Sequence, residues 1–173
     1  VHGQDAVVFM AGSTLGLAHK TADGEVVSIE DEAFRDILME SLDAVRESVE
    51  EDAGSQLILT TVSCRDPELT GVPELNEPMV DAIRWDRDLT QRYTDPVVVN
   101  ALLRDWADKN HVPLLDLYEV LGCEDGFDAM IHGHPIYRDF FHFSSVGAQM
   151  VWSWLIPEIQ AVLKNDSSSK VTP

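Results

Sequence analysis

Basic residues are scarce in this chain of 173 residues, which has 12 Lys and Arg against 31 Asp and Glu and a formal net charge of −19. Such a surface repels phosphate backbones and anionic membranes, so nucleic-acid binding is a poor explanation of the protein. Long apolar runs are missing too, because none approaches the roughly 18 residues of a membrane-spanning helix. We interpret the acidic excess as a heavily solvated surface.

Cysteine is equally rare, and the two that exist, Cys64 and Cys123, belong to no CxxC or other zinc-binding spacing. Cys64 follows the strand-like LILTTVS, and Cys123 follows LLDLYEVLG. If these stretches form neighbouring parallel strands, both thiols lie near the carboxyl edge of the sheet. A disulfide and a pair of reduced thiols remain open alternatives, and a disulfide indicates an oxidising compartment.

The hydrophobic pattern predicts strands that alternate with helices. Strands are expected at Asp5–Met10, Gln56–Val62 and Val112–Leu117, and helices at 34–49, 96–110 and 145–156, the last restarted or kinked by Pro157 through Leu163. The connecting segments are a loop or small hairpin turning at Asp23-Gly24, a loop over 64–78, a broken helix over 79–93 and an irregular stretch over 122–139. We expect one domain over residues 1–164 and a disordered tail over 165–173.

This order of elements predicts an α/β fold, a three-layer α/β/α sandwich with an open parallel sheet of flavodoxin-like type. In such sheets the loops at the carboxyl ends of the strands carry the site. Gly12 and the loops at Cys64 and Cys123 then share one edge. The loop that carries Asp139 and His142 joins them if the last helix packs back on the sheet.

Asp139 and His142 lie three residues apart, just before the apolar final helix. Hydrolases and acyltransferases use an imidazole to take a proton from a nucleophile, and a carboxylate to orient that imidazole and stabilise its charged form. The spacing alone is a weak signal, because an exposed histidine beside a helix cap fits it as well.

The sequence around this pair, DFFHFSSVGAQMVWSWLIPEI, resembles the last block of the SGNH (GDSL-like) hydrolase superfamily. There an Asp-x-x-His is followed by Phe, a helix-capping Ser or Thr, and Gly-Ala. DAVVFMAGSTLGL resembles the block that gives a glycine to the oxyanion hole, SQLILTTVSCRDP the next strand, and VVVNALLRDWADKNHVPLLDLYEVLGC the Asn-bearing helix and the strand after it. The likeness covers nearly the whole chain and is greatest to SGNH domains fused to type-three membrane acyltransferases, especially those of actinobacteria.

The resemblance implies that His142 is the general base, that Asp139 orients it, and that Gly12 donates a backbone N–H to the oxyanion. It implies an esterase or O-acyltransferase that acts on acyl esters, such as O-acetyl groups on carbohydrate, without a metal or a cofactor. It also implies a location in the cell envelope, outside the cytoplasmic membrane, with a membrane acyltransferase domain fused to or associated with the chain.

Three features depart from the family pattern. The first strand and its Gly-Asp-Ser block are missing, Thr14 stands where typical members carry an asparagine, and the sheet is therefore unfinished. We expect an N-terminally truncated domain that is inactive by itself, with its serine outside this chain. Ser13 is a weak nucleophile candidate, because the segments after it follow the order expected behind the oxyanion block. The alternative is a non-catalytic remnant, or a carbohydrate-binding or structural module of the same fold.

Two further groups have structural interpretations. Ser144 and Ser145 follow His142 directly and are expected to cap the last helix rather than to react. His132 and His134 have no third ligand at a suitable spacing, so a turn or an edge segment is favoured over a metal pair.

Overall fold

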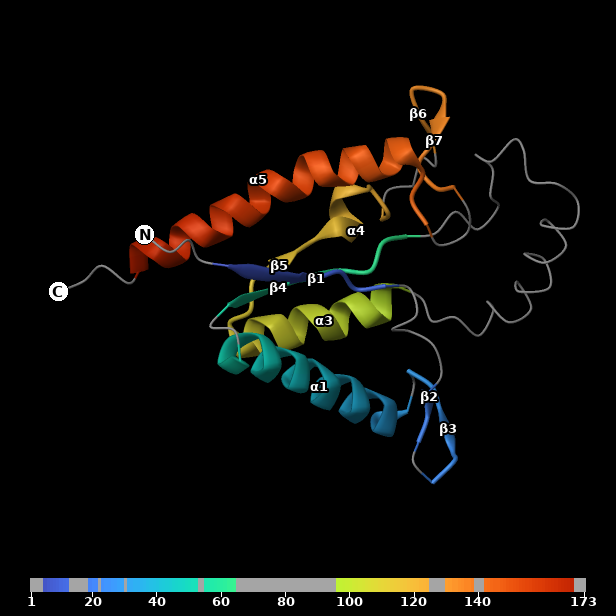
Figure 1. Cartoon of the computed structure of the whole chain (residues 1–173). Coiled ribbons are helices and arrows are strands. Elements are labelled where there is room, and N and C mark those ends of the chain that lie inside the picture. The colour runs from blue at the N-terminus through green and yellow to red at the C-terminus, as the bar shows by residue number, and fades with distance from the viewer. Residues whose placement is uncertain are drawn as a thin grey trace, which may run out of the picture.

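A computed structural model of the chain describes residues 5–12, 19–21, 23–29, 31–52, 55–64, 96–124, 130–138 and 142–169 (Figure 1). Within these ranges the central sheet has three parallel strands in the order β1-β4-β5, with bounds Ala6–Phe9, Gln56–Thr60 and Leu114–Leu115. β1 pairs with β4 along its length, with Ala6 opposite Gln56, and Leu59 of β4 lies opposite Leu114 of β5. The expected α/β fold with a parallel sheet is confirmed.

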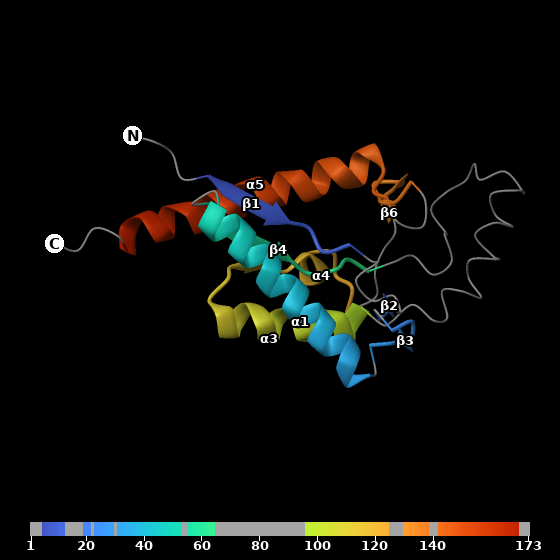
Figure 2. The same cartoon turned by 60° about the horizontal axis from the view of Figure 1, so that its bottom comes forward.

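Helices cover both faces of this sheet, which makes three layers (Figures 1 and 2). The bounds are Glu32–Glu47 for α1, which the π-helical turn η2 continues over Ser48–Asp52, Pro96–Asn110 for α3, Leu117–Val120 for α4 and Ser145–Ser169 for α5. Side chains alternate along β4, so Leu57 and Leu59 pack in one buried cluster with Phe34 of α1, while Ile58 packs against Leu155 of α5. The central strand is therefore buried on both faces.

β5 is shorter than the strand expected over Val112–Leu117. Asp116 ends it, because its carboxylate accepts a hydrogen bond from the Glu119 N–H at 3.1 Å and so begins the short helix α4. The hydrophobic pattern did not predict this helix, which at one turn is too short to show a periodicity.

Two small antiparallel hairpins flank the sheet, β2 with β3 (His19–Lys20 and Val26–Val27) and β6 with β7 (Met130–Ile131 and His134–Pro135). The turn predicted at Asp23-Gly24 is confirmed in the first hairpin, where Gly24 has a φ of 93°. The second hairpin corrects the expectation of an irregular stretch over 122–139. His132 and Gly133 form its turn, both with positive φ, which suits a tight two-residue connection.

The last helix is also longer than expected, since α5 continues through Pro157 to Ser169. The disordered tail predicted over 165–173 is therefore wrong for residues 165–169, while 170–173 lie outside the described residues. Proline removes the N–H that would bond the Ser153 carbonyl, but both residues are exposed, so water can satisfy that carbonyl without breaking the helix. Within the described ranges no helix, α5 included, is long and apolar enough to cross a membrane.

The arrangement brings several loops to one end of the molecule. The carboxyl ends of the strands, both hairpins and the start of α5 lie at that end in two views (Figures 1 and 2). The loop and broken helix predicted over 64–78 and 79–93 lie outside the described residues, apart from Cys64 itself. The edge expected to carry the site is therefore the edge at which the described loops gather.

Candidate functional site

Two consecutive threonines are fully buried, Thr60 at the end of β4 and Thr61 directly after it. The Thr60 hydroxyl accepts a hydrogen bond from the Ala11 N–H at 3.1 Å, in the loop that carries Gly12. The Thr61 hydroxyl donates to Asp116 Oδ1 at 3.0 Å and accepts from the Tyr118 N–H at 2.9 Å. The end of the central strand therefore fastens the loops after both neighbouring strands.

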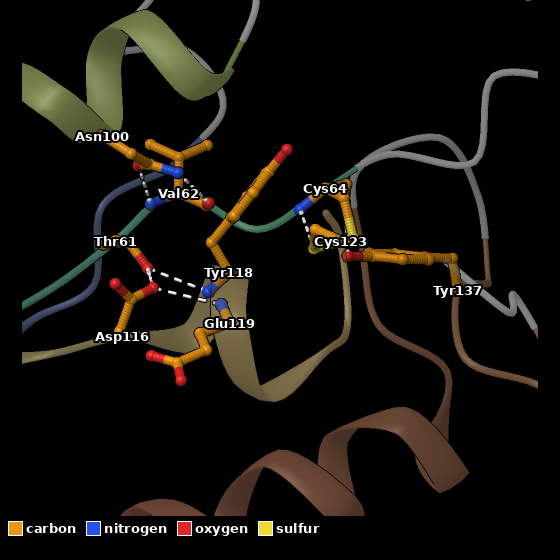
Figure 3. The surroundings of a disulfide bond; sticks show 9 residues. All are labelled: Thr61, Val62, Cys64, Asn100, Asp116, Tyr118, Glu119, Cys123 and Tyr137. Carbon is orange, nitrogen blue, oxygen red and sulfur yellow. Dashed lines mark hydrogen bonds between the residues drawn. A yellow bond between two sulfur atoms is a disulfide. The ribbon is translucent and has the colours of Figure 1, made fainter. Parts of the chain in front are cut away.

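A third buried polar side chain, Asn100 of α3, fixes the segment that follows these threonines. Its Oδ1 accepts from the Val62 N–H at 2.8 Å, and its Nδ2 donates to the Val62 carbonyl at 2.9 Å (Figure 3). Both backbone polar groups of one loop residue are thus satisfied by one side chain. In the sequence, only a family resemblance drew attention to the Asn-bearing helix, and this role of Asn100 was not predicted.

Asp116 lies on the same edge and carries a persistent negative charge. Burial raises its pKa, but hydrogen bonds from Arg104, from the Glu119 N–H and from the Thr61 hydroxyl outweigh it and hold the pKa below the ordinary value. Arg104 approaches one carboxylate oxygen, Oδ2, with Nη2 at 2.7 Å and Nε at 2.9 Å. These partners occupy the carboxylate, so we assign Asp116 a structural role.

The two cysteines are joined in a disulfide, Cys64–Cys123, with an S–S distance of 2.10 Å and 5.6 Å between their Cα atoms. The bond connects the loop after β4 to the loop after α4, across a sequence separation of 59. The Cys64 N–H also donates to Cys123 Sγ at 3.3 Å (Figure 3). Of the two alternatives left open by the sequence, the structure has the bonded one.

His142 lies three residues before α5, and it is exposed. An antiparallel bridge joins Tyr137 to Phe143, and the Arg138 N–H donates to the His142 carbonyl at 2.8 Å. The rings of Tyr137 and Phe143 stack with their centroids 4.9 Å apart. The backbone of His142 is therefore held by its hydrogen bond with Arg138 and by the bridge at the next residue, Phe143.

The first turn of α5 packs tightly against the same segment. Ser144 caps the helix, as predicted, by accepting a hydrogen bond from the Gly147 N–H at 3.1 Å, and it donates to the Pro135 carbonyl at 2.5 Å. A Cβ at Gly147 would lie 2.0 Å from the Ile136 carbonyl oxygen, so only glycine fits there. Close packing explains the glycine in this block.

The predicted site residues fall into two groups. His142 and Gly12 are described and exposed, the first before α5 and the second after β1. Asp139 and Ser13 lie outside the described residues, so the assignment of a triad remains a prediction. In the part of the chain that the structure describes, no group of three His, Cys, Asp or Glu side chains could hold a metal ion.

Layer order and the parallel sheet define the fold as a three-layer α/β/α sandwich, as expected. The solved lipase/acylhydrolase from Enterococcus faecalis has a similar fold, with a TM-score of 0.52 and 19% sequence identity. The match covers 91% of this chain but 62% of that one, so the chain spans less than two thirds of its structural neighbour. At this identity the likeness establishes the fold alone. No protein-family model matches the chain, and no curated protein does.

Proposed function

We propose that this chain is the base-bearing part of an SGNH-type esterase or O-acyltransferase whose nucleophilic serine lies outside the chain. The observation that carries the proposal is the position of His142, exposed on a backbone-anchored turn at the edge that also holds Gly12. A fold similar to that of a lipase/acylhydrolase supports the same class of chemistry.

In the proposed reaction the serine Oγ attacks the acyl carbonyl while His142 takes its proton. Asp139 orients the imidazole, and the Gly12 N–H donates to the oxyanion. The alcohol of the ester leaves with the proton from His142, and an acyl-serine remains. Water or a sugar hydroxyl then attacks the acyl-serine with His142 again as base, which releases the acid or the new ester and restores the serine.

The strand that would bring the serine has a natural place beside β1. Val7 of this outer strand is 42% exposed, an apolar side chain that an additional strand and its helix would cover. We further propose that the substrate is a small acyl ester such as O-acetyl carbohydrate, and that a membrane acyltransferase domain accompanies the chain. The disulfide supports an extracytoplasmic location, because such bonds persist in oxidising compartments.

A serine-directed fluorophosphonate probe tests the proposal on the protein translated from the complete reading frame. We expect labelling of a serine upstream of Val1, and hydrolysis of an activated acetyl ester that falls about a thousandfold in His142→Ala. His134→Ala is the matched control, since it removes another exposed imidazole at the same end of the molecule. Turnover that survives His142→Ala would refute the assignment of the base.

The same probe separates the alternatives. Labelling of residues 1–173 by themselves, lost in Ser13→Ala, would identify Ser13 as the nucleophile and contradict the missing serine. A complete protein that neither reacts with the probe nor hydrolyses esters would favour the non-catalytic carbohydrate-binding or structural module.

A further inference from the structure

Tyr137 connects two parts of the candidate site that are distant in sequence. Its hydroxyl donates to the Cys64 carbonyl at 2.6 Å, a contact that spans 73 residues, and its side chain is buried at 4% exposure. Figure 3 shows the ring reaching from the segment before α5 to the disulfide. One side chain therefore joins the turn that carries His142 to the loop after the central strand.

The His142 end of this connection is well defined. The ring of Tyr137 stacks on Phe143, the next residue after His142, and the backbones of the same two residues form the bridge that closes the turn. The Ser144 N–H adds a hydrogen bond to the Ile136 carbonyl at 2.8 Å. A shift of Tyr137 would therefore move the backbone of His142 as well.

The Cys64 end is fixed independently. Cys64 is buried and bonded to Cys123. Val62, two residues before Cys64, has both of its backbone polar groups hydrogen-bonded to the Asn100 side chain. The carbonyl that Tyr137 reaches therefore belongs to an anchored loop.

The hydroxyl group of Tyr137 distinguishes its role from that of a phenylalanine at the same position. A phenylalanine would stack on Phe143 and fill the buried space, and a buried hydroxyl stabilises the protein only where it finds a partner. Here the partner is a backbone carbonyl beside the disulfide. The hydroxyl of Tyr137 therefore links the segment before α5 to the Cys64 loop, and a phenylalanine ring could not form this link.

We propose that Tyr137 is a positioning residue that sets the place of His142 relative to the end of β4. Its catalytic consequence rests on the function proposed above, because only a working base needs such placement. The placement itself is a property of this chain and can be measured without any activity.

The test is Tyr137→Phe, which removes the hydroxyl and keeps the ring. By NMR we expect the Arg138 and Ser144 amides to exchange about fivefold faster, the loss that one hydrogen bond accounts for, with a shift of the His142 ring resonances at constant pH. Ser41→Ala is the matched control, since it removes a hydroxyl that donates to a backbone carbonyl at 2.7 Å on α1, far from the turn in sequence. It should leave all these signals unchanged.

Unchanged exchange and unchanged His142 resonances in Tyr137→Phe would overturn the proposal, whatever the protein catalyses. If this variant does not fold, Phe143→Leu removes the stacked ring from the other side and must give the same two changes. In the complete protein, Tyr137→Phe should lower kcat for an acyl ester about tenfold with KM unchanged. If kcat falls in His142→Ala but not in Tyr137→Phe, the positioning role is overturned. If His142→Ala keeps full activity, the proposed function is refuted, and the NMR experiment alone decides whether Tyr137 places His142.

Discussion

Asn100 holds Val62 by both of its backbone polar groups, with distances of 2.8 and 2.9 Å and no exposure of the amide side chain. The pair joins α3 to the loop after β4, and this loop leads directly to the disulfide. A buried amide group that lacks a hydrogen-bond partner destabilises the fold by about 1–3 kcal/mol. The Asn100 side chain is tolerated here because both Oδ1 and Nδ2 have partners.

Asn100→Leu should therefore lower the free energy of unfolding by about 3 kcal/mol, because leucine keeps the branched shape while the Val62 N–H and carbonyl lose their partners. Urea unfolding followed by circular dichroism measures this difference. Ala101→Leu, on the exposed next position of α3, controls for the change in composition. A loss below about 0.5 kcal/mol would mean that water replaces the amide and that the pair is not structural.

Thr60→Val should loosen the loop that carries Gly12. The substitution keeps the shape of a fully buried side chain and removes the oxygen that accepts from the Ala11 N–H. We expect a loss of about 1–2 kcal/mol in stability and about tenfold faster exchange of the Ala11 amide. Thr60→Ser keeps the hydroxyl and should retain the protection of this amide. Equal exchange in the two variants would contradict the role of the hydroxyl.

Removing the disulfide should destabilise the whole domain. The Cys64→Ser, Cys123→Ser double variant frees a loop of 59 residues in sequence separation, for which chain entropy predicts about 4 kcal/mol. Thermal unfolding with and without a dithiol reductant measures the effect. The unsubstituted protein should lose stability on reduction, and the double variant should not respond. A reductant effect of the same size in both proteins would exclude the bond as its cause.

The hydrogen bonds between distant segments, such as those of Thr60 and Thr61, could not be predicted from the sequence. The apolar run of β4 and the spacing of α3 predicted the layers, because burial on a strand or helix follows a short period. The Thr60 and Thr61 pair was visible at the end of a strand, but its partners lie 49 to 57 residues away, at distances that only the folded backbone brings together. For the same reason His142 was predicted as a site residue from a local pattern, whereas Tyr137 became a candidate only through its tertiary contact with Cys64.

The length of α5 shows the opposite limit. The Asn, Asp and Ser residues after Leu163 predicted a disordered tail, yet the helix continues to Ser169. Helix propensity differs by less than about 1 kcal/mol per residue among these types, so extension from an existing helix outweighs it. Local composition is therefore a weak guide to where a long helix ends.

The charge of Asp116 should make stability fall in acid. Its pKa is lowered in the folded protein, so its contribution is fully present above the unfolded value of about 3.9 and is lost as the pH falls through the folded pKa. Asp116→Asn should flatten the decline in unfolding free energy below about pH 4. Arg104→Gln should raise the pKa of Asp116 toward its ordinary value, which carboxyl NMR can follow. An unaltered acid slope in Asp116→Asn would place the acid sensitivity elsewhere.

Gly147 tests how tightly the segment before α5 is held against this helix. A methyl group there would lie 2.0 Å from the Ile136 carbonyl oxygen and 2.9 Å from its carbon, and these backbone atoms cannot move aside as a flexible side chain would. Gly147→Ala should therefore lower the free energy of unfolding by about 2–3 kcal/mol, although alanine favours helices. The Ser144 N–H, whose acceptor is that same carbonyl, should lose protection from exchange at the same time. Ser145→Ala, exposed in the same first turn, should leave both properties unchanged. A Gly147→Ala protein as stable as the original would show that the turn and α5 separate easily, which is incompatible with a fixed place for His142.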